Sequence, residues 1–554
     1  MMPNLKLIRI FLFITTLMLV GLACSASTPD DGTVNVPRNA VVIDILSNTA
    51  ATTWLQAAAN EFNAQDIEND AGNQLFVTVT GLESGQAVID LQGGGATNAI
   101  WLPEETVWSN VLADQGNNQY QADCVSTAQS PLVIGMWRPI AQSLGWPGLP
   151  LGWLDVGSLA ADPNAWQYYS GGLYGDTLRL GHTHPGLSGS GTAALLAIVH
   201  AAEAKQEPVS VDDIQRPIVQ ASVGAFESSV AWFSTSTASL ANTMTERGDQ
   251  YLGAGVMYES SVYQQQTAGA DIVPIYPFEG TFVANFPACI NGSAPADVQA
   301  GARQFRDFLL SPEGQTIAVN HGFRPLDNTD TTAITNLDSF DLNQPTTTFA
   351  PPTVATIYAV QDLWQSARKD VNLVMLLDTS GSMRGLKMDN MLSSAIQFVE
   401  QMGDDDYISI IAFSTEPEVI VYHQKVGETR QDVLNQIRLL NAGGDTTLFD
   451  AVGDGATLIQ ETTRVDTSNA MIVLTDGQDT RSYRYNFDED LVQLAAGNST
   501  TIFTIAYGSD ADADTLRSLA DRANGNFFPG DEASIAAIYE EMSAAFGGSV
   551  GVGR

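Results

Sequence analysis

Apolar and polar residues are distributed along the chain in two stretches where short apolar runs alternate with helix-like segments. In the first stretch, Val41–Leu46 and Leu75–Val79 read as strands, and Thr52–Phe62 between them has the spacing of a helix. The alternation continues to about residue 325. Strands that alternate with helices predict a mostly parallel sheet with helical crossovers.

The second stretch follows a change of composition. Residues 327–352 are rich in Thr, Asp, Asn and Pro and predict a linker, and Val354–Lys369 predicts a helix that leads into the next domain. Asn372–Leu377 is a near-continuous apolar run, as expected for a strand covered on both faces. Further strands are expected at Tyr407–Phe413, Val419–Val421, Ala470–Leu474 and Thr501–Ala506, and helices at Met388–Met402, Asp432–Leu440, Leu448–Glu461 and Glu489–Ala496. This order predicts a doubly wound α/β domain over residues 370–546, with a flexible tail at 547–554.

The N-terminus is typical of an export signal. Lys6 and Arg9 precede the apolar run Ile10–Ala23, which is shorter than the roughly 20 apolar residues that span a bilayer. Cys24 and the small, polar residues after it resemble a bacterial lipoprotein processing site. This resemblance implies a signal peptide at 1–24, a lipid on Cys24, a flexible tether at 25–38 and an extracytoplasmic, membrane-anchored protein. Plain secretion is the alternative.

Charge and cysteine content narrow the function further. The net charge of −39 disfavours nucleic acid and anionic lipid as partners, so the membrane would be contacted through the lipid anchor only. Beyond Cys24, the chain has Cys124 and Cys289. Two cysteines in an exported protein predict one disulfide between them, and too few ligands for a cysteine metal site.

Three polar motifs follow strands or precede a helix in the second domain. Asp378, Ser380 and Ser382 form an Asp-x-Ser-x-Ser loop after the first strand, Thr446 precedes a helix, and Asp476 ends another buried strand. Open α/β sheets place ligands at the carboxyl ends of their strands. Hydroxyl and carboxylate oxygens suit Mg²⁺, which takes six oxygen ligands.

Together these motifs resemble the von Willebrand factor A-type (VWA) family and its metal-ion-dependent adhesion site, on a Rossmann-like fold. The resemblance implies Ser380, Ser382 and Thr446 as ligands of Mg²⁺, with Mn²⁺ or Ca²⁺ as substitutes, and Asp378 and Asp476 as the charged groups. It also implies an open coordination position for a carboxylate of a protein partner. No nucleophile–base pair accompanies the site, so the sequence predicts a binding protein and not an enzyme.

Two further acidic runs, Asp404–Asp406 and Asp510–Asp514, are expected to be solvated loops.

Residues 39–326 carry motifs at four places, namely Gly81–Ala87, Ser130–Trp137, His184–Thr192 and Phe305–Gln315. They resemble bacterial extracellular solute-binding proteins of the molybdate/sulfate type, which implies a bilobal, periplasmic-binding-protein-like domain with an interlobe cleft. The order of the segments resembles bacterial surface lipoproteins described as substrate-binding plus VWA.

The expected cleft has candidate anion donors. Ser84 and Ser190 each lie in a Ser-Gly turn before a helix, where free N–H groups and the helix dipole attract anions. Ser188 and Thr192 extend the set. The serines are equally explained as helix caps, and the domain as a spacer without a ligand. Two functions therefore stay open: metal-dependent capture of a protein, or delivery of a small solute to a transport system.

Overall fold

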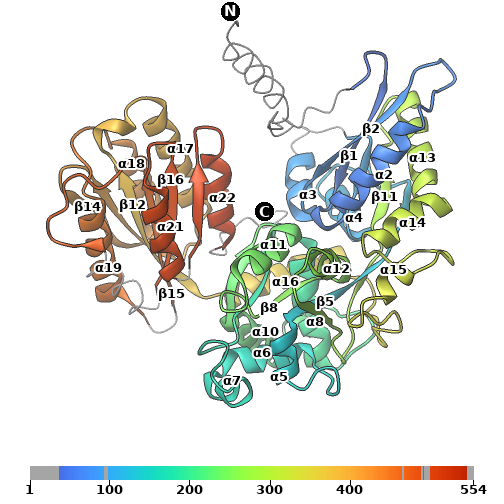
Figure 1. The fold of residues 1–554 in the computed structure, drawn as a ribbon, viewed down its shortest axis with the longest axis horizontal. Helices are drawn as coiled ribbons and strands as arrows, with labels where there is room; N and C mark the ends of the chain where they lie inside the picture. Colours follow the sequence, from blue (N-terminus) through green and yellow to red (C-terminus); the bar gives the residue numbers. More distant parts are fainter. Residues whose placement is uncertain are drawn as a thin grey trace, which may run out of the picture.

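The structure, a computed structural model, describes residues 36–92, 98–464, 467–487, 491, 500–523 and 525–545. The predicted signal peptide, Cys24, the tail at 547–554 and most of the helix expected at Glu489–Ala496 lie outside these residues. No helix within the described ranges is long and apolar enough to cross a membrane. Figure 1 shows a bilobal N-terminal domain beside a C-terminal α/β domain.

The first lobe is a sheet in the order β2-β1-β3-β11-β4. Parallel pairing of β1 with β2 and β3 matches the pattern of buried apolar runs, while β11 pairs antiparallel with β3 and β4. Its strands are β1 Val41–Ser47, β2 Leu75–Gly81, β3 Ile100–Leu102, β4 Cys124–Ser126 and β11 Pro287–Ile290. Its helices are η1 Thr49–Ala51, α2 Thr52–Ala64, α3 Ser84–Gln92, α4 Val107–Asp114, α13 Ala296–Leu309 and α14 Pro312–Asn320.

The second lobe is a mixed sheet in the order β10-β5-β8-β6-β7, with β9 also paired to β5. The prediction of a mostly parallel sheet is wrong for this lobe, because β5 pairs antiparallel with β8, β9 and β10. The strands are β5 Ser130–Trp137, β6 Leu180–Thr183, β7 Val230–Ser234, β8 Ala254–Tyr258, β9 Ile272–Ile275 and β10 Val283–Ala284. The helices are α5 Arg138–Ser143, α6 Trp153–Ala161, α7 Pro163–Ser170, α8 Gly189–Glu203, α9 Val211–Ile214, α10 Pro217–Ser229, α11 Thr237–Arg247 and α12 Glu259–Thr267.

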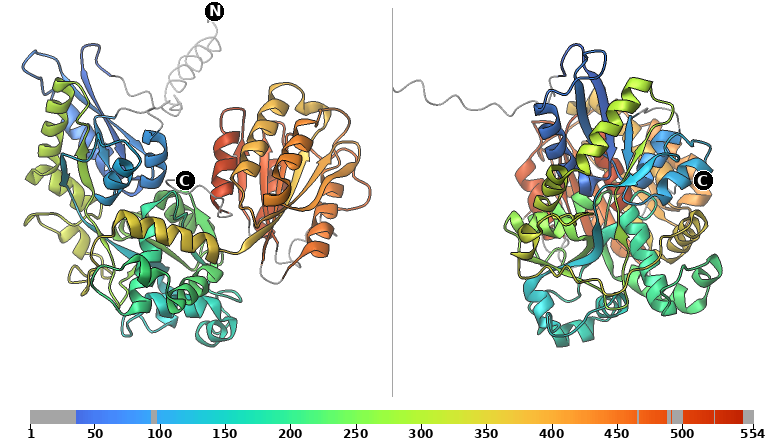
Figure 2. Two further views of the ribbon diagram at one scale, coloured as in Figure 1. Left: turned by 180° about the vertical axis from the view of Figure 1, so that it is seen from behind. Right: turned by 90° about the vertical axis from the view of Figure 1, so that its right-hand side faces the viewer.

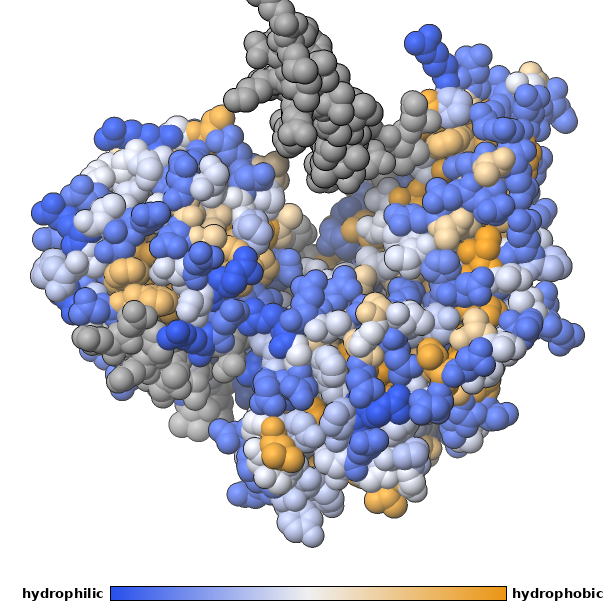
Figure 3. Space-filling view, in the orientation of Figure 1, coloured by the Kyte–Doolittle hydropathy of each residue, from blue (hydrophilic) through white to orange (hydrophobic). Residues whose placement is uncertain are grey.

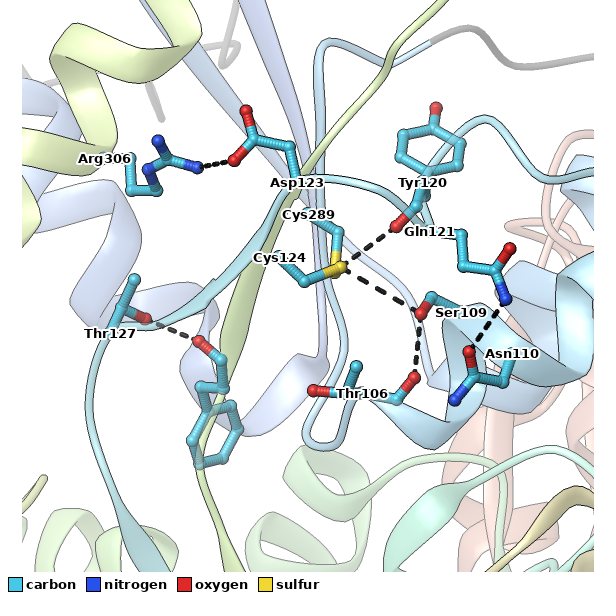
Figure 4. The surroundings of a disulfide bond; sticks show 11 residues. Thr106, Ser109, Asn110, Tyr120, Gln121, Asp123, Cys124, Thr127, Cys289 and Arg306 are labelled. Carbon is cyan, nitrogen blue, oxygen red and sulfur yellow. Dashed lines mark hydrogen bonds and ion pairs between the residues drawn. A yellow bond between two sulfur atoms is a disulfide. The ribbon is translucent and has the colours of Figure 1, made fainter.

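A disulfide joins Cys124 and Cys289 where the chain passes between the lobes. The two cysteines are register partners on β4 and β11. Figure 4 shows the bond beside the ion pair of Asp123 with Arg306. The bridge therefore fixes the first-lobe ends of two crossover segments, β4 to β5 and β10 to β11.

The segment expected as a linker packs on the bilobal domain. It contains α15 Thr332–Thr335 and α16 Val354–Ala367. The ring of Phe349 stacks on His200 of α8 at 4.2 Å, and the indole N–H of Trp364 donates to Glu227 at 2.9 Å. Figure 2 shows α16 lying across the second lobe before the chain enters the C-terminal domain.

The C-terminal domain is a six-stranded sheet in the order β14-β13-β12-β15-β16-β17. All neighbouring pairs are parallel except β13 with β14. The strands are β12 Asp370–Asp378, β13 Tyr407–Phe413, β14 Pro417–Lys425, β15 Thr467–Thr475, β16 Thr501–Tyr507 and β17 Phe527–Gly530. The helices are α17 Leu386–Gln401, α18 Val426–Arg438, α19 Leu448–Thr462, α21 Ala513–Arg522 and α22 Ile535–Ala545, with the short η2 at Gly381–Met383.

Alternate residues of β12 enter two apolar cores, one on each face of this sheet. Leu373 and Met375 pack with α17, α18 and α22, whereas Val374 and Leu376 pack with α19 and α21. Both faces are therefore covered, as the apolar run predicted. The domains meet where Trp232 of β7 stacks on Phe503 of β16. The face of the molecule seen in Figure 3 is mostly hydrophilic, in keeping with the strong net charge.

Candidate metal centre and interlobe cleft

The candidate metal residues come from loops that follow adjacent strands. Leu377 of β12 is the register partner of Leu474 of β15, so Asp378 and Thr475 leave the sheet side by side. The loop before α19 lies against the first loop through two backbone hydrogen bonds, from Gly381 N to Gly444 O and from Gly443 N to Thr379 O. The topology thus places all three motifs at one sheet edge.

The first loop turns its hydroxyls to one side. Asp378 is fully buried and accepts a hydrogen bond from the Ser380 backbone N–H at 2.8 Å. The Ser380 and Ser382 hydroxyl oxygens lie 2.9 Å apart, and Ser382 is exposed. The i, i+2 spacing therefore brings both hydroxyls together, as the motif predicts.

Asp476 completes this pair from the second strand. It is fully buried and accepts from the Ser382 hydroxyl at 2.6 Å and from the Lys387 ammonium at 2.6 Å. The Thr475 hydroxyl donates to Asp378 at 2.6 Å. These bonds link the two carboxylates into one network.

The Thr446 hydroxyl lies near the Ser382 hydroxyl, on either side of Gly477. A Cβ built on Gly477 would lie 3.6 Å from Thr446 Oγ1 and 4.0 Å from Ser382 Oγ, so both hydroxyls border the same glycine. The Thr446 carbonyl accepts from the backbone N–H groups of Thr480 and Arg481. Thr446 is therefore held between the loops that carry Ser382 and Asp476.

Sequence reasoning missed Asp450 and Lys387. Asp450 is fully buried on α19 and accepts from the backbone N–H groups of Tyr483, Arg484 and Tyr485, which anchors the loop after Asp476. The Thr-x-Leu-x-Asp spacing that begins at Thr446 contained Asp450, but its backbone partners lie more than 30 residues away. Nothing in the sequence pairs Lys387 with Asp476.

The electrostatics suit a cation. Burial raises the pKa of Asp378, and the charge of Asp476 raises it further, while hydrogen bonds from Thr475 and Ser380 lower it. The donors are all oxygens, the ligand type that Mg²⁺ takes. Among the described residues no group of three or more His, Cys, Asp or Glu side chains has the arrangement of a metal site. The oxygen groups gathered at this point are hydroxyls of Ser380, Ser382 and Thr446 and carboxylates of Asp378 and Asp476.

The expectation of a solvated loop at Asp404–Asp406 was wrong for Asp406. Its carboxylate is buried and makes two hydrogen bonds to the Arg368 guanidinium, at 3.0 and 3.1 Å. In the other acidic run, the Asp512 side chain accepts from Thr515 N at 3.1 Å and caps α21, while Asp510 and Asp514 are exposed.

The candidate cleft residues lie together but bond to the chain itself. Ser188 donates to Glu83 at 2.6 Å, and Ser84 donates to Glu104. The Ser190 hydroxyl lies 2.8 Å from those of Thr183 and Thr237, and Thr192 donates to the Pro185 carbonyl at 2.6 Å. The structure thus brings Ser84, Ser188 and Ser190 to the buried contact between the two lobes, next to two glutamates that sequence reasoning did not include.

Comparisons with known proteins agree with this architecture. The family described as bacterial extracellular solute-binding protein matches residues 43–324, and the von Willebrand factor type A domain matches residues 372–541. The fold and the loops thus define a bilobal solute-binding domain followed by a VWA domain. The first match covers half of the chain, and the chain belongs to the bacterial extracellular solute-binding proteins.

Curated relatives match less than a third of the chain. The uncharacterized protein sll0103 of Synechocystis is 29% identical over 165 residues, which are 29% of this chain and 37% of that protein. Human inter-alpha-trypsin inhibitor heavy chain H3 is 24% identical over 157 residues, which are 27% of this chain and 18% of that protein. The chain therefore spans well under two thirds of the length of these relatives.

The chain is also similar to solved structures of a solute-binding protein and of a von Willebrand factor type A protein. The sulfate-binding protein SubI of Mycobacterium tuberculosis is 16% identical, with a TM-score of 0.41, and the match covers 57% of this chain and 96% of SubI. A von Willebrand factor type A protein of Catenulispora acidiphila is 23% identical, with a TM-score of 0.29, over 32% of this chain and 42% of that one.

The families matched are mostly binding proteins and not enzymes. Solute-binding domains bind small ligands, and VWA domains mediate protein interactions and commonly bind divalent metal ions.

Proposed function

We propose that this protein is an extracytoplasmic receptor, lipid-anchored through Cys24, whose VWA domain binds Mg²⁺ and captures an acidic group of a protein partner. The observation that carries the proposal is the convergence of Asp378, Ser380, Ser382, Thr446 and Asp476 at one sheet edge. Mn²⁺ or Ca²⁺ would substitute, since both are bound through oxygen ligands.

Each residue has a defined task in this function. Ser380, Ser382 and Thr446 would offer hydroxyl oxygens to the ion, and Asp378 and Asp476 would balance its charge. When bound, Mg²⁺ would supply an open coordination position for a carboxylate from outside. Ser382 lies at the exposed side of the site, so the partner would approach from there. The proposed role of these residues is binding and not catalysis.

The test compares Asp378→Ala with Asp389→Ala, a control that removes an exposed carboxylate from the neighbouring helix α17. Titration calorimetry of the exported chain should give Mg²⁺ binding in wild type and control, and none in Asp378→Ala. A pull-down from native surface extract should retain a partner with Mg²⁺ and lose it with EDTA. Equal Mg²⁺ binding by Asp378→Ala and wild type would refute the assignment.

A second candidate function is reception of a small solute for a transport system, which membership of the solute-binding family favours. Its cleft residues would be Ser84, Ser188, Ser190 and Thr192. Thermal unfolding of the exported chain against oxyanions, carboxylates and sugars tests it, because a ligand of the native state raises the midpoint. No rise with any of the three classes would leave the VWA function alone.

A further inference from the structure

The interlobe cleft contains a carboxylate that belongs to the chain itself. Glu83 lies just before α3 on the first lobe and is 2% exposed. Its Oε1 accepts from the Thr49 hydroxyl and from the Thr237 backbone N–H at 2.9 Å. Its Oε2 accepts from the Ser188 hydroxyl at 2.6 Å and from the Asn48 amide at 3.3 Å. Thr49 and Asn48 belong to the first lobe and Ser188 and Thr237 to the second, so one side chain bridges both.

These four groups are the donors that a bound anion would need. Thr237 is the first residue of α11 and Ser188 directly precedes α8, so two helix N-termini of the second lobe face Glu83. The Thr237 N–H cannot accept a hydrogen bond, so it requires an acceptor opposite. The Asn48 NH₂ group is also a donor only, and it donates to Glu104 at 2.8 Å as well as to Glu83. Burial raises the pKa of Glu83, while the hydrogen bonds from Ser188, Thr49 and Thr237 lower it.

The lobes are closed around this side chain. The Gln86 backbone N–H of the first lobe donates to the Leu187 carbonyl of the second at 3.0 Å. A Cβ on Gly85 would lie 2.6 Å from the carbonyl oxygens of Gly186 and Leu187, so glycine permits this approach and larger residues do not. The closed arrangement is therefore present with Glu83 as the only carboxylate that joins Ser188 to Thr237 among the described residues.

The route to Glu83 from outside is unfavourable for an anion. A pocket of about 440 Å³ reaches Glu83 and is bordered by Gln86, by Asp90 of α3 and by Glu541 of α22. None of the described residues that line it is Lys or Arg. A free anion would therefore pass two carboxylates before it reached donors that Glu83 already occupies.

We propose that Glu83 is a built-in ligand, whose carboxylate fills the carboxylate position of the interlobe cleft and holds the two lobes closed without a solute. The site is then complementary to a carboxylate, and an external one binds when the side chain of Glu83 is removed. This goes beyond the VWA function and gives a reason why the two lobes contact each other without a solute.

The experiment uses the exported chain with Glu83→Ala, which removes a unit of nearly the size of acetate. Glu61→Ala is the matched control, an exposed glutamate on α2 of the same lobe. All nine tryptophans lie between residues 54 and 364, so tryptophan fluorescence reports unfolding of the bilobal domain.

Glu83→Ala should lower the midpoint of thermal unfolding by several degrees, because buried donors lose their acceptor. Acetate or formate at tens of millimolar should raise it again by about 1–3 °C. Neither salt should affect wild type or Glu61→Ala beyond the effect of equal chloride. An unchanged midpoint in Glu83→Ala, or equal stabilisation of wild type by acetate, would overturn the proposal.

If Glu83→Ala does not fold, a second variant tests the same proposal. Glu83→Gln keeps the size of the side chain but turns an NH₂ group towards donors. Hydrogen exchange at the Thr237 amide should be at least tenfold faster in Glu83→Gln than in wild type, and acetate should not slow it. Equal exchange at Thr237 in the two proteins would show that the carboxylate charge does not hold the lobes.

Discussion

Loss of Arg368 should destabilise the VWA domain and leave the stability of the bilobal domain unchanged. Arg368 ends the connection from α16 to β12, and its guanidinium pairs with Asp406, with 5% and 2% of the two side chains exposed. Arg368→Met removes the charge and keeps much of the apolar stem, so Asp406 stays buried with two backbone donors, Val371 N at 2.9 Å and Gly403 N at 2.7 Å.

Removing one partner of a buried ion pair costs about 3–5 kcal/mol, and the two remaining donors to Asp406 favour the lower end. For a domain of this size, about 3 kcal/mol lowers the midpoint of thermal unfolding by roughly 6–12 °C. The neighbouring pair of Lys425 with Asp405 is the control, because it is much more exposed, 34% and 71%. Lys425→Met should leave the midpoint unchanged, since exposed pairs contribute little.

The assay exploits the distribution of aromatic residues. No tryptophan follows residue 364, so circular dichroism follows both domains while tryptophan fluorescence follows mainly the bilobal one, with Trp232 alone known to stack on the VWA domain among the described ring contacts. Arg368→Met should shift a transition in circular dichroism and leave the main fluorescence transition in place, apart from a small change where Trp232 loses its contact with Phe503. A shift below 2 °C in Arg368→Met, or an equal shift in Lys425→Met, would refute the role of burial.

Three further outcomes are expected. Lys387→Met should tighten Mg²⁺ binding by about tenfold in calorimetry, because the Lys387 ammonium lies 2.6 Å from the Asp476 carboxylate and would repel the ion, and two unit charges about 4 Å apart repel by about 1 kcal/mol even in water; unchanged affinity would mean that Lys387 moves away freely. Replacement of Cys124 and Cys289 by serine should destabilise the bilobal domain by about 2–5 kcal/mol in urea, followed by tryptophan fluorescence, because the bridge closes a loop of 165 residues. Burial first, and then the nearby charge of Glu83, raises the pKa of Glu104 from 4.5 to about 7. Between these two values Glu104 keeps its proton in the folded protein and loses it in the unfolded chain. The free energy of unfolding therefore falls by about 3 kcal/mol as pH rises from about 4.5 to about 7. Glu104→Gln should make the free energy of unfolding depend less steeply on pH than in wild type. Some dependence should remain, because Glu83, Glu105 and Tyr258 lie around the site in both proteins. An identical pH profile would contradict the assignment.

The sequence by itself determined the local elements and their order. The apolar runs at Val41–Leu46, Tyr407–Phe413 and Thr501–Ala506 became strands at nearly those bounds. The last two are buried at nearly every position, and a strand covered on both faces consists of consecutive apolar residues. The Asp-x-Ser-x-Ser loop could also be predicted from the sequence, because a spacing of two residues is enough to bring its two hydroxyls together.

Only the tertiary structure decided which polar groups meet. Asp406 belongs to an acidic run like its neighbours, yet it alone is buried against Arg368, which lies 38 residues away. Lys387 and Asp476 lie 89 residues apart, and Glu83 and Thr237 lie 154 apart. A sequence shows that Ser84 and Ser188 are donors near helix starts, but not that a glutamate of the other lobe supplies the acceptor for Ser188. Packing sets those distances, and burial then makes a carboxylate a structural anchor, a candidate ligand of a metal ion or an occupant of its own cleft.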